Sequence, residues 1–337
     1  MVKVRESGCG TVRIRLATFN IENLGRRSGG TPAIEARRPT LQAQLTRLDA
    51  DILCLQEVNA QEGKPGPARQ LLDLDAVLAG TPYAAFERAC TLRKSGVGPL
   101  DIHNLVTLSR WPIRHSRQLW NEMVAPPHYQ PPATNPPTGD TAAIAWDRPI
   151  LLCKIVIGPK RALHVINLHL RAPIAAHLAD RKLAPGAWKS VSGWAEGFFV
   201  AAVKRTGQAF EARLAVDEIF DADAGALIAV VGDFNATARE APVRIVRGDP
   251  QDTGNAELAG RALVALAECA DESTFTVVHG ERRLMLDHIL ASRPLALACR
   301  KITIDNASLL DETEPPWVGA LRPGSYHAPV VAEFELP

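Results

Sequence analysis

Seven polar side chains each close or follow an apolar run of the sequence, and their types suit ion binding and proton transfer. They are Asn20, Glu57, His169, Asp233, Asn235, Asp287 and His327. Carboxylate and amide oxygens suit a hard divalent cation such as Mg²⁺ or Mn²⁺, and histidine commonly transfers protons near neutral pH. Because each residue alone is an ordinary turn former or cap, the prediction rests on their combination.

The elements that would position these residues follow a mixed α/β pattern. Apolar content typical of buried strands occurs in Val12–Ile21, Ile52–Val58, Ala162–Leu170, Ala226–Val231 and Leu284–Ala291. Helical spacing occurs in Thr40–Leu48 and from about Phe199 to Phe220. Strands interleaved with helices predict an α/β fold, in which polar residues from several strand ends converge at one edge.

Length and composition limit the class of protein. The chain has 337 residues, of which 46% are hydrophobic and 22% charged, so it can bury a sizeable core. No break in composition marks a boundary, and we expect one domain over residues 12–337, with loop insertions near 111–149 and 172–208. Six scattered cysteines do not have the spacing of a zinc site or a disulfide scaffold.

Charge and hydropathy point to a soluble protein without a broad basic surface. The formal net charge of +1 argues against the extended positive field of a tight, non-specific nucleic-acid binder. No apolar run reaches the roughly 18 residues needed to span a bilayer, and the first residues lack the apolar stretch of a secretory signal. We therefore expect a cytoplasmic protein, and a monomer.

Five ordered blocks contain most of the polar residues and resemble the endonuclease/exonuclease/phosphatase superfamily, in particular its deoxyribonuclease I-like members. They are TFNIEN at Thr18–Asn23, LQEV at Leu55–Val58, GDFN at Gly232–Asn235, LDH at Leu286–His288 and SYHAPV at Ser325–Val330. The resemblance implies a four-layer α/β/β/α sandwich, with two mixed β-sheets packed face to face. It also implies hydrolysis of phosphoesters with a divalent metal, Mg²⁺ or Mn²⁺, and we expect a single ion because of the departure from the family pattern described below.

The resemblance also implies a role for each matching residue. Glu57 is the expected metal carboxylate, and Asn20 the amide that supports the metal or the phosphate. Asp233 and Asn235 would position the attacking water and the phosphate, with Gly232 permitting a tight turn beside them.

The histidines complete the expected site. His327, oriented by Asp287, would contact the phosphate or share the proton of the water. His169 would assist the departing oxygen. The sequence departs from the family pattern at Tyr326, where most relatives have aspartate, and this loss of a carboxylate puts a second metal ion in doubt.

The substrate is a weaker inference, drawn from the end of the predicted strand Ala162–Leu170 and the segment that follows it. Asn167 and Arg171 flank His169, and Trp188 and Trp194 lie among cationic residues, a mixture that can hold phosphates and stack bases. The alternative is an amphipathic helix whose aromatic rings pack on the core. We expect a nuclease acting on DNA or RNA. A phosphatase or phosphodiesterase for a small-molecule or lipid phosphoester, and a non-catalytic nucleic-acid-binding or phosphate-binding relative, remain alternatives.

Overall fold

The computed structural model describes residues 6–7, 11–25, 33–63, 69–131, 141–159, 161–269, 274–313 and 324–337. Its first sheet has seven strands, with β1 (Glu6–Ser7) paired to β2. The other strands are, in spatial order, β20 (Cys299–Ile304), β21 (Val330–Leu336), β2 (Thr11–Leu24), β3 (Ile52–Val58), β7 (Asn104–Ser109) and β6 (Glu87–Cys90). Only β2 and β3 pair in parallel, so the sheet is mixed.

The second sheet is also mixed, with β12 and β15 as its parallel pair. Its six strands are, in order, β16 (Leu263–Ala265), β19 (Asp287–Ser292), β15 (Leu227–Asp233), β12 (Arg161–His169), β11 (Ile150–Gly158) and β8 (Ile113–Leu119). Four short hairpins are separate from these sheets: β4 (Gln61–Glu62) with β5 (Arg69–Gln70), β9 (His128–Tyr129) with β10 (Ala142–Ala143), β13 (Lys182–Ala184) with β14 (Ala187–Trp188), and β17 (Val277–His279) with β18 (Arg282–Leu284).

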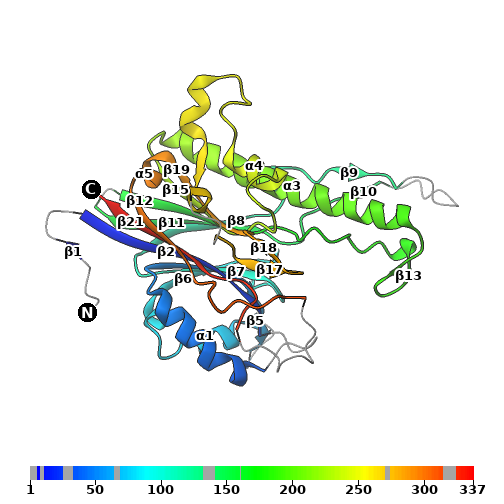
Figure 1. Cartoon of the computed structure of the whole chain (residues 1–337), viewed down its shortest axis with the longest axis horizontal. Coiled ribbons are helices and arrows are strands. Elements are labelled where there is room, and N and C mark those ends of the chain that lie inside the picture. The colour runs from blue at the N-terminus through cyan, green and yellow to red at the C-terminus, as the bar shows by residue number, and fades with distance from the viewer. Residues whose placement is uncertain are drawn as a thin grey trace.

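Helices cover the outer face of each sheet, so the order of layers is helix, sheet, sheet, helix (Figure 1). On one side are α1 (Ile34–Leu48) and α2 (Leu72–Leu78), and on the other are α3 (Val191–Ala222) and α4 (Ala241–Arg247), with the short α5 (Arg293–Leu297) beside β15 and β19. The predicted four-layer sandwich is confirmed.

Strand alternation separates the inner core from the outer cores. In β2, Ile14 and Leu16 belong to the cluster between the sheets, whereas Ala17 and Phe19 pack with α1 and α2. This is the two-residue period of a strand buried on both faces. Farther along the inner face of β2, the side chains change from apolar to polar, with Thr18 followed by Asn20, and both are fully buried. The inner layer therefore becomes polar toward one end of the sandwich.

Both expected loop insertions contain regular structure. The segment 111–149 includes β8, an edge strand of the second sheet, although residues 132–140 lie outside the described part of the chain. The segment 172–208 includes β13, β14 and the first half of α3, which begins at Val191 rather than near residue 199.

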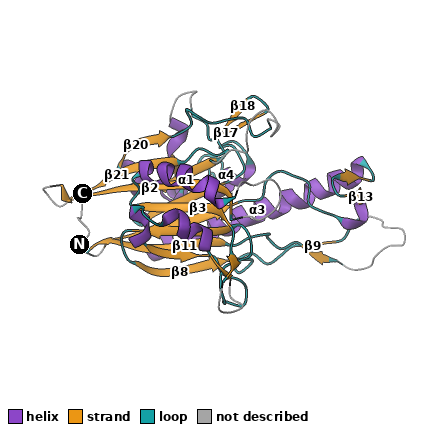
Figure 2. Ribbon diagram, turned by 90° about the horizontal axis from the view of Figure 1, so that it is seen from below, coloured by secondary structure: helices purple, strands orange, loops and turns teal. Residues whose placement is uncertain are grey.

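The first ten residues of α3 (Val191–Val200), with the hairpins β9–β10 and β13–β14, form an arm that projects beyond the sheets (Figure 1, Figure 2). At 1.5 Å per residue, the 32 residues of α3 extend over about 48 Å. Among the helices of the described chain, none combines the length and apolar character needed to cross a membrane.

Candidate active site

The ends of four strands, two from each sheet, bring the central residues of the site together. Asn20 comes from β2, Glu57 from β3, His169 from β12 and Asp233 from β15. The Asn20 Nδ2 group donates to Glu57 Oε1 at 3.2 Å and to Asp233 Oδ2 at 3.0 Å, so one buried amide connects carboxylates from the two sheets. Asn20 Oδ1 accepts a hydrogen bond from the backbone N–H of Glu22 at 3.0 Å. In this arrangement Asn20 orients Glu57, and its own oxygen is held by the backbone.

Glu57 reaches the site because the strand is irregular at that point. Its φ of +61° lies in the left-handed region, and the pairing of β3 shifts register on both sides of the strand between Leu55 and Val58. Glu57 Oε2 accepts from the backbone N–H of Asn23 at 2.9 Å. Burial alone would raise the pKa of Glu57, but His103, His327 and Arg148 lower it overall, so the carboxylate is charged at neutral pH.

Asp233 is buried and closely held by Asn235. The backbone N–H of Asn235 donates to Asp233 Oδ1 at 2.8 Å, and Asn235 Nδ2 donates to Asp233 Oδ2 at 3.1 Å. Gly232 does not form a turn: it lies within β15, opposite Leu168 of β12. A Cβ atom at Gly232 would lie 1.9 Å from the Leu168 carbonyl oxygen, and its φ is +137°. Glycine is therefore required for close approach of the two strands.

His327 and Asp287 form the expected pair. His327 Nδ1 lies 2.8 Å from Asp287 Oδ2, and His327 Nε2 lies 3.9 Å from Asp233 Oδ2. Burial alone would lower the pKa of His327, but Asp287 and then Asp233 raise it to about 10. Burial, followed by the charge of Asp287, raises the pKa of Asp233 to about 7. The histidine is therefore protonated at neutral pH, while Asp233 is close to its midpoint of protonation.

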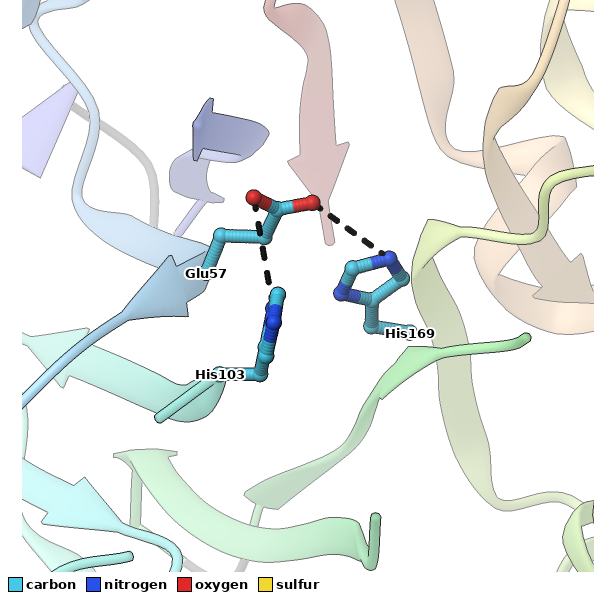
Figure 3. A group of neighbouring side chains, drawn as sticks. All are labelled: Glu57, His103 and His169. Carbon is cyan, nitrogen blue, oxygen red and sulfur yellow. Dashed lines mark ion pairs between the residues drawn. The ribbon is translucent and has the colours of Figure 1, made fainter. Parts of the chain in front are cut away.

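His169 and His103 each face one oxygen of the Glu57 carboxylate (Figure 3). His169 Nε2 is 3.7 Å from Glu57 Oε1 and 3.4 Å from Asp233 Oδ2, and His103 Nδ1 is 4.0 Å from Glu57 Oε2. On its other side, His169 Nδ1 lies 2.5 Å from Arg148 Nη1. Burial, then the positive charge of Arg148, lowers the pKa of His169 well below its usual value, so this ring is neutral.

Within the described part of the chain, two groups of side chains have the composition and spacing to hold a metal ion. Glu57, His103 and His169 offer ligand atoms within 4.8 Å of one another, and so do Asp233, Asp287 and His327. Glu57 is the better anchor for a hard cation because it is charged and reaches the site from a fixed backbone position. The Glu57 carboxylate therefore has the properties expected of the metal ligand.

Four residues expected to contact substrate have different environments. Asn167 is fully buried between the sheets, where its Oδ1 accepts from Gln56 Nε2 at 2.8 Å and its Nδ2 donates to the carbonyl oxygens of Leu55 and Val106 at 3.3 and 3.2 Å. The structure contradicts the expectation that Asn167 contacts substrate, because its amide is enclosed by these partners. Arg171 is paired with Asp147 near His169.

The two tryptophans lie on the arm, away from the reacting groups. The Lys182 ammonium lies 4.1 Å from the centre of the Trp188 ring, and the edge of this ring abuts Gly197, so Trp188 packs within the arm. Trp194 is 45% exposed and lies beside Phe198, with ring centroids 5.6 Å apart. Of the two rings, Trp194 is the more available for a ligand.

The sequence interpretation missed three residues of this site. Arg148 precedes β11 in the expected loop insertion, and His103 lies in the loop before β7 with a φ of +56°. Neither lies in a recognisable motif. Glu22 lies in the first block, and its Oε2 accepts from the backbone N–H of Tyr326 at 2.8 Å. The Glu22 carboxylate thus lies beside Tyr326, the position at which the family pattern has aspartate. Glu22 follows Asn20 by two residues in the first block, and this spacing was the signal that could have identified it.

Comparisons with known proteins agree with this architecture. No curated protein matches the sequence. Among solved structures, truncated TDP2 from Caenorhabditis elegans aligns over 96% of this chain and 97% of its own, with a TM-score of 0.56 and 16% identity. A family protein from Bacteroides thetaiotaomicron aligns over 97% and 96%, with a TM-score of 0.57 and 15% identity.

A third solved structure is the 3′ phosphatase NExo from Neisseria, bound to a product DNA hairpin. It aligns over 95% of this chain and 99% of its own, with a TM-score of 0.52 and 17% identity. At these identities the structures show a shared fold. The family model described as the endonuclease/exonuclease/phosphatase family matches residues 17–327, a range that extends from before Asn20 to His327. The chain belongs to the endonuclease/exonuclease/phosphatase family.

Proposed function

We propose that this protein hydrolyses phosphodiester bonds with the help of one divalent cation, Mg²⁺ or Mn²⁺. The observation that carries the proposal is the convergence on Asp233 Oδ2 of His327 Nε2 at 3.9 Å and His169 Nε2 at 3.4 Å, beside the charged carboxylate of Glu57. A phosphate placed here would meet one cationic imidazole, one neutral imidazole and a carboxylate able to accept a proton. These are the groups that an in-line displacement by water requires.

The raised pKa values of Asp233 and His327 assign their roles, because one group stays near its midpoint at neutral pH and the other stays protonated. Asp233, with a pKa of about 7, is suited to accept a proton from the attacking water as the new oxygen–phosphorus bond forms. His327, with a pKa of about 10, is already protonated and donates a hydrogen bond to the phosphate. It can also supply a proton to the leaving oxygen as the old bond breaks. This assignment replaces the sequence-based expectations that His327 shares the proton of the water and that His169 assists the departing oxygen.

Glu57 is the residue that would hold the ion, with Asn20 fixing its carboxylate. When bound, a divalent cation would offset the negative charge of the phosphate and stabilise the charge that develops in the transition state. Asn235 keeps Asp233 in place through two hydrogen bonds, and its own side chain is fixed to the Leu170 carbonyl oxygen at 3.0 Å. Water activation therefore uses a preorganised carboxylate.

Nucleic acid is the substrate class that the surroundings favour. Ala201, Arg205 and Gln208 lie on one face of α3 at helical spacing and are buried against the body, where Arg205 Nη2 donates to the Asn235 carbonyl oxygen at 2.8 Å. The same face continues along the arm as Trp194 and Phe198, which are exposed.

At 1.5 Å per residue, Trp194 lies about 17 Å along the helix from Arg205. This is about five times the 3.4 Å rise of stacked nucleotides. A strand that leaves the site along this face can therefore stack its bases on the two rings, which supports nuclease activity. The similar fold bound to a DNA hairpin is consistent with this choice.

The experiment compares wild type with His327→Ala on single-stranded DNA, duplex DNA, RNA and bis-p-nitrophenyl phosphate, with Mg²⁺, Mn²⁺ or a chelator. Metal-dependent cleavage that is lost in the variant supports the proposal. A variant at an exposed ion pair, Arg47→Ala, controls for non-specific effects because Arg47 pairs with Asp305 away from these residues. Cleavage of none of these substrates by wild type would contradict the proposal, and phospholipid vesicles would then test the lipid alternative.

A further inference from the structure

Arg148 has an unusual position for a cation, because its guanidinium contacts a histidine ring inside the site. Arg148 is half-buried immediately before β11, and its carbonyl oxygen accepts from Gln208 Nε2 of α3 at 3.0 Å. Its Nη1 lies 2.5 Å from Nδ1 of His169. The neighbouring Asp147 carboxylate instead binds Arg171 and Lys204, one on each oxygen. Arg148 therefore approaches the site from fixed backbone.

The chemistry of the two groups determines where the proton of His169 lies. A guanidinium has five N–H donors and no acceptor, and it stays protonated in proteins. A hydrogen bond between Arg148 and His169 therefore requires Nδ1 to present its lone pair. A neutral imidazole that accepts at Nδ1 carries its single proton on Nε2. A doubly protonated ring would place two N–H groups against each other, so the contact also disfavours the cationic form.

The protonated Nε2 faces the reacting region. It lies 3.4 Å from Asp233 Oδ2 and 3.7 Å from Glu57 Oε1, and Figure 3 shows the ring turned toward Glu57. A ring nitrogen that carries a proton has no lone pair to give to a metal ion. Although His169 has the spacing of a ligand in the group with Glu57 and His103, this proton makes its Nε2 a hydrogen-bond donor instead.

We propose that Arg148 is a positioning residue that holds His169 in the Nε2–H form, as an uncharged donor to a phosphate oxygen and not as a metal ligand. The donor role rests on the proposed phosphodiester hydrolysis, whereas the position of the proton does not. The site thus gains a donor to phosphate without a second cationic histidine.

The position of the proton is measured by NMR of the full-length, metal-free protein labelled with ¹⁵N-histidine. Two-bond ¹H–¹⁵N correlations distinguish the two neutral tautomers and the cation, and a His169→Gln variant identifies the signal among the nine histidines. We expect a proton on Nε2 and none on Nδ1. Arg148→Met should abolish this preference, and Arg148→Lys, which keeps a cationic donor, should restore it at least in part. A wild-type ring protonated at Nδ1, or a preference unchanged in Arg148→Met, would overturn the proposal.

The same spectra test the exclusion of His169 from the metal. We expect its Nε2 proton to persist when Mg²⁺ is added. Loss of this proton on addition of the ion, with the shift of a coordinated nitrogen, would identify His169 as a ligand and overturn the proposal. Because these measurements need no turnover, they remain decisive even if wild type cleaves no phosphodiester and the proposed function fails.

Kinetics test the donor role. Arg148→Met should lower kcat by roughly 10- to 100-fold with KM changed by less than about 3-fold, because a preorganised donor to developing charge acts mainly in the transition state. The matched control is Arg117→Met, which removes an arginine from an exposed ion pair with Glu218. Equal kcat values for Arg148→Met, Arg117→Met and wild type would contradict the donor role.

Discussion

Replacement of Asp287 by asparagine should disable His327 while leaving the surrounding backbone in place. Asp287 is fully buried, and its Oδ2 lies 2.8 Å from His327 Nδ1. Asparagine has nearly the same shape but lacks the negative charge, and its NH₂ group can hydrogen-bond the ring only by donating to Nδ1. The ring would then lose its most important anionic partner and present the wrong nitrogen to the phosphate.

The size of the effect follows from the pKa of His327. A rise from 6.5 to about 10 corresponds to roughly 5 kcal/mol at 1.36 kcal/mol per pKa unit. Asp287 is the largest of three carboxylates that raise it, with Asp233 and Glu57, so it accounts for at least about a third, or roughly 1.6 kcal/mol. Loss of this share moves the pKa of His327 back toward its reference value, and the wrong tautomer should lower kcat by roughly 10²- to 10⁴-fold, the range of acid–base groups.

The assay is kcat and KM of Asp287→Asn on bis-p-nitrophenyl phosphate with saturating Mg²⁺ or Mn²⁺, from pH 5 to 10. The alkaline limb that reports deprotonation of His327 should move to lower pH in the variant. Asp305→Asn, which removes the charge of an exposed ion pair with Arg47, is the matched control. If Asp287→Asn folds normally and keeps kcat within about 2-fold of wild type across this range, the assigned role of the pair is refuted.

Three further outcomes are expected. Glu57→Gln should weaken binding of Mg²⁺ and Mn²⁺ by at least roughly 10-fold in calorimetric titrations, and unchanged affinity would exclude Glu57 as the anchor. Trp194→Ala should raise KM for single-stranded oligonucleotides by roughly 5- to 100-fold, since each stacked base contributes about 1–3 kcal/mol, but not KM for bis-p-nitrophenyl phosphate. Urea unfolding of the metal-free protein should show stability that falls as pH rises. Because the folded pKa of His327, about 10, exceeds its reference value of 6.5, its contribution is complete below pH 6.5 and lost as pH rises through 10. The slope over this window should flatten in His327→Gln, and an unchanged slope would show that another group causes it.

Much of the site could be predicted because it follows from the period of the strands. On β12, Val165, Asn167 and His169 occupy successive positions of the inner face. Val165 packs in the apolar core, Asn167 is a buried amide, and His169 lies in the site. The same progression occurs on β15, where Val231 precedes Asp233. A polar residue that continues an inner-face series beyond the core must therefore reach the open end of the sandwich.

The alternation also explains the wrong assignment of Asn167. It lies one inner-face position before His169 and therefore still within the space between the sheets, where Gln56 and two backbone carbonyl groups take up its amide. Proximity in sequence to His169 gave a wrong prediction for Asn167, because a shift of two residues along the strand moves a side chain from the core to the site.

Arg148 and His103 could not be predicted because no local pattern positions them. Each lies in an irregular segment before a strand, and its place depends on contacts with distant parts of the chain. The carbonyl oxygen of Arg148 is held by Gln208 of α3, 60 residues away in sequence. Such tertiary contacts leave no periodic signal in a single sequence.

The charges beside the two histidines explain how one residue type can take two roles within one site. His327 has the carboxylate of Asp287 at Nδ1 and is cationic, whereas His169 has the guanidinium of Arg148 at Nδ1 and is neutral. Both present Nε2 toward the same oxygen of Asp233, at 3.9 and 3.4 Å. A second carboxylate in place of Arg148 would instead favour two cationic rings beside Asp233. With the arginine at Nδ1, His169 offers a donor to the phosphate without a second cationic ring beside Asp233.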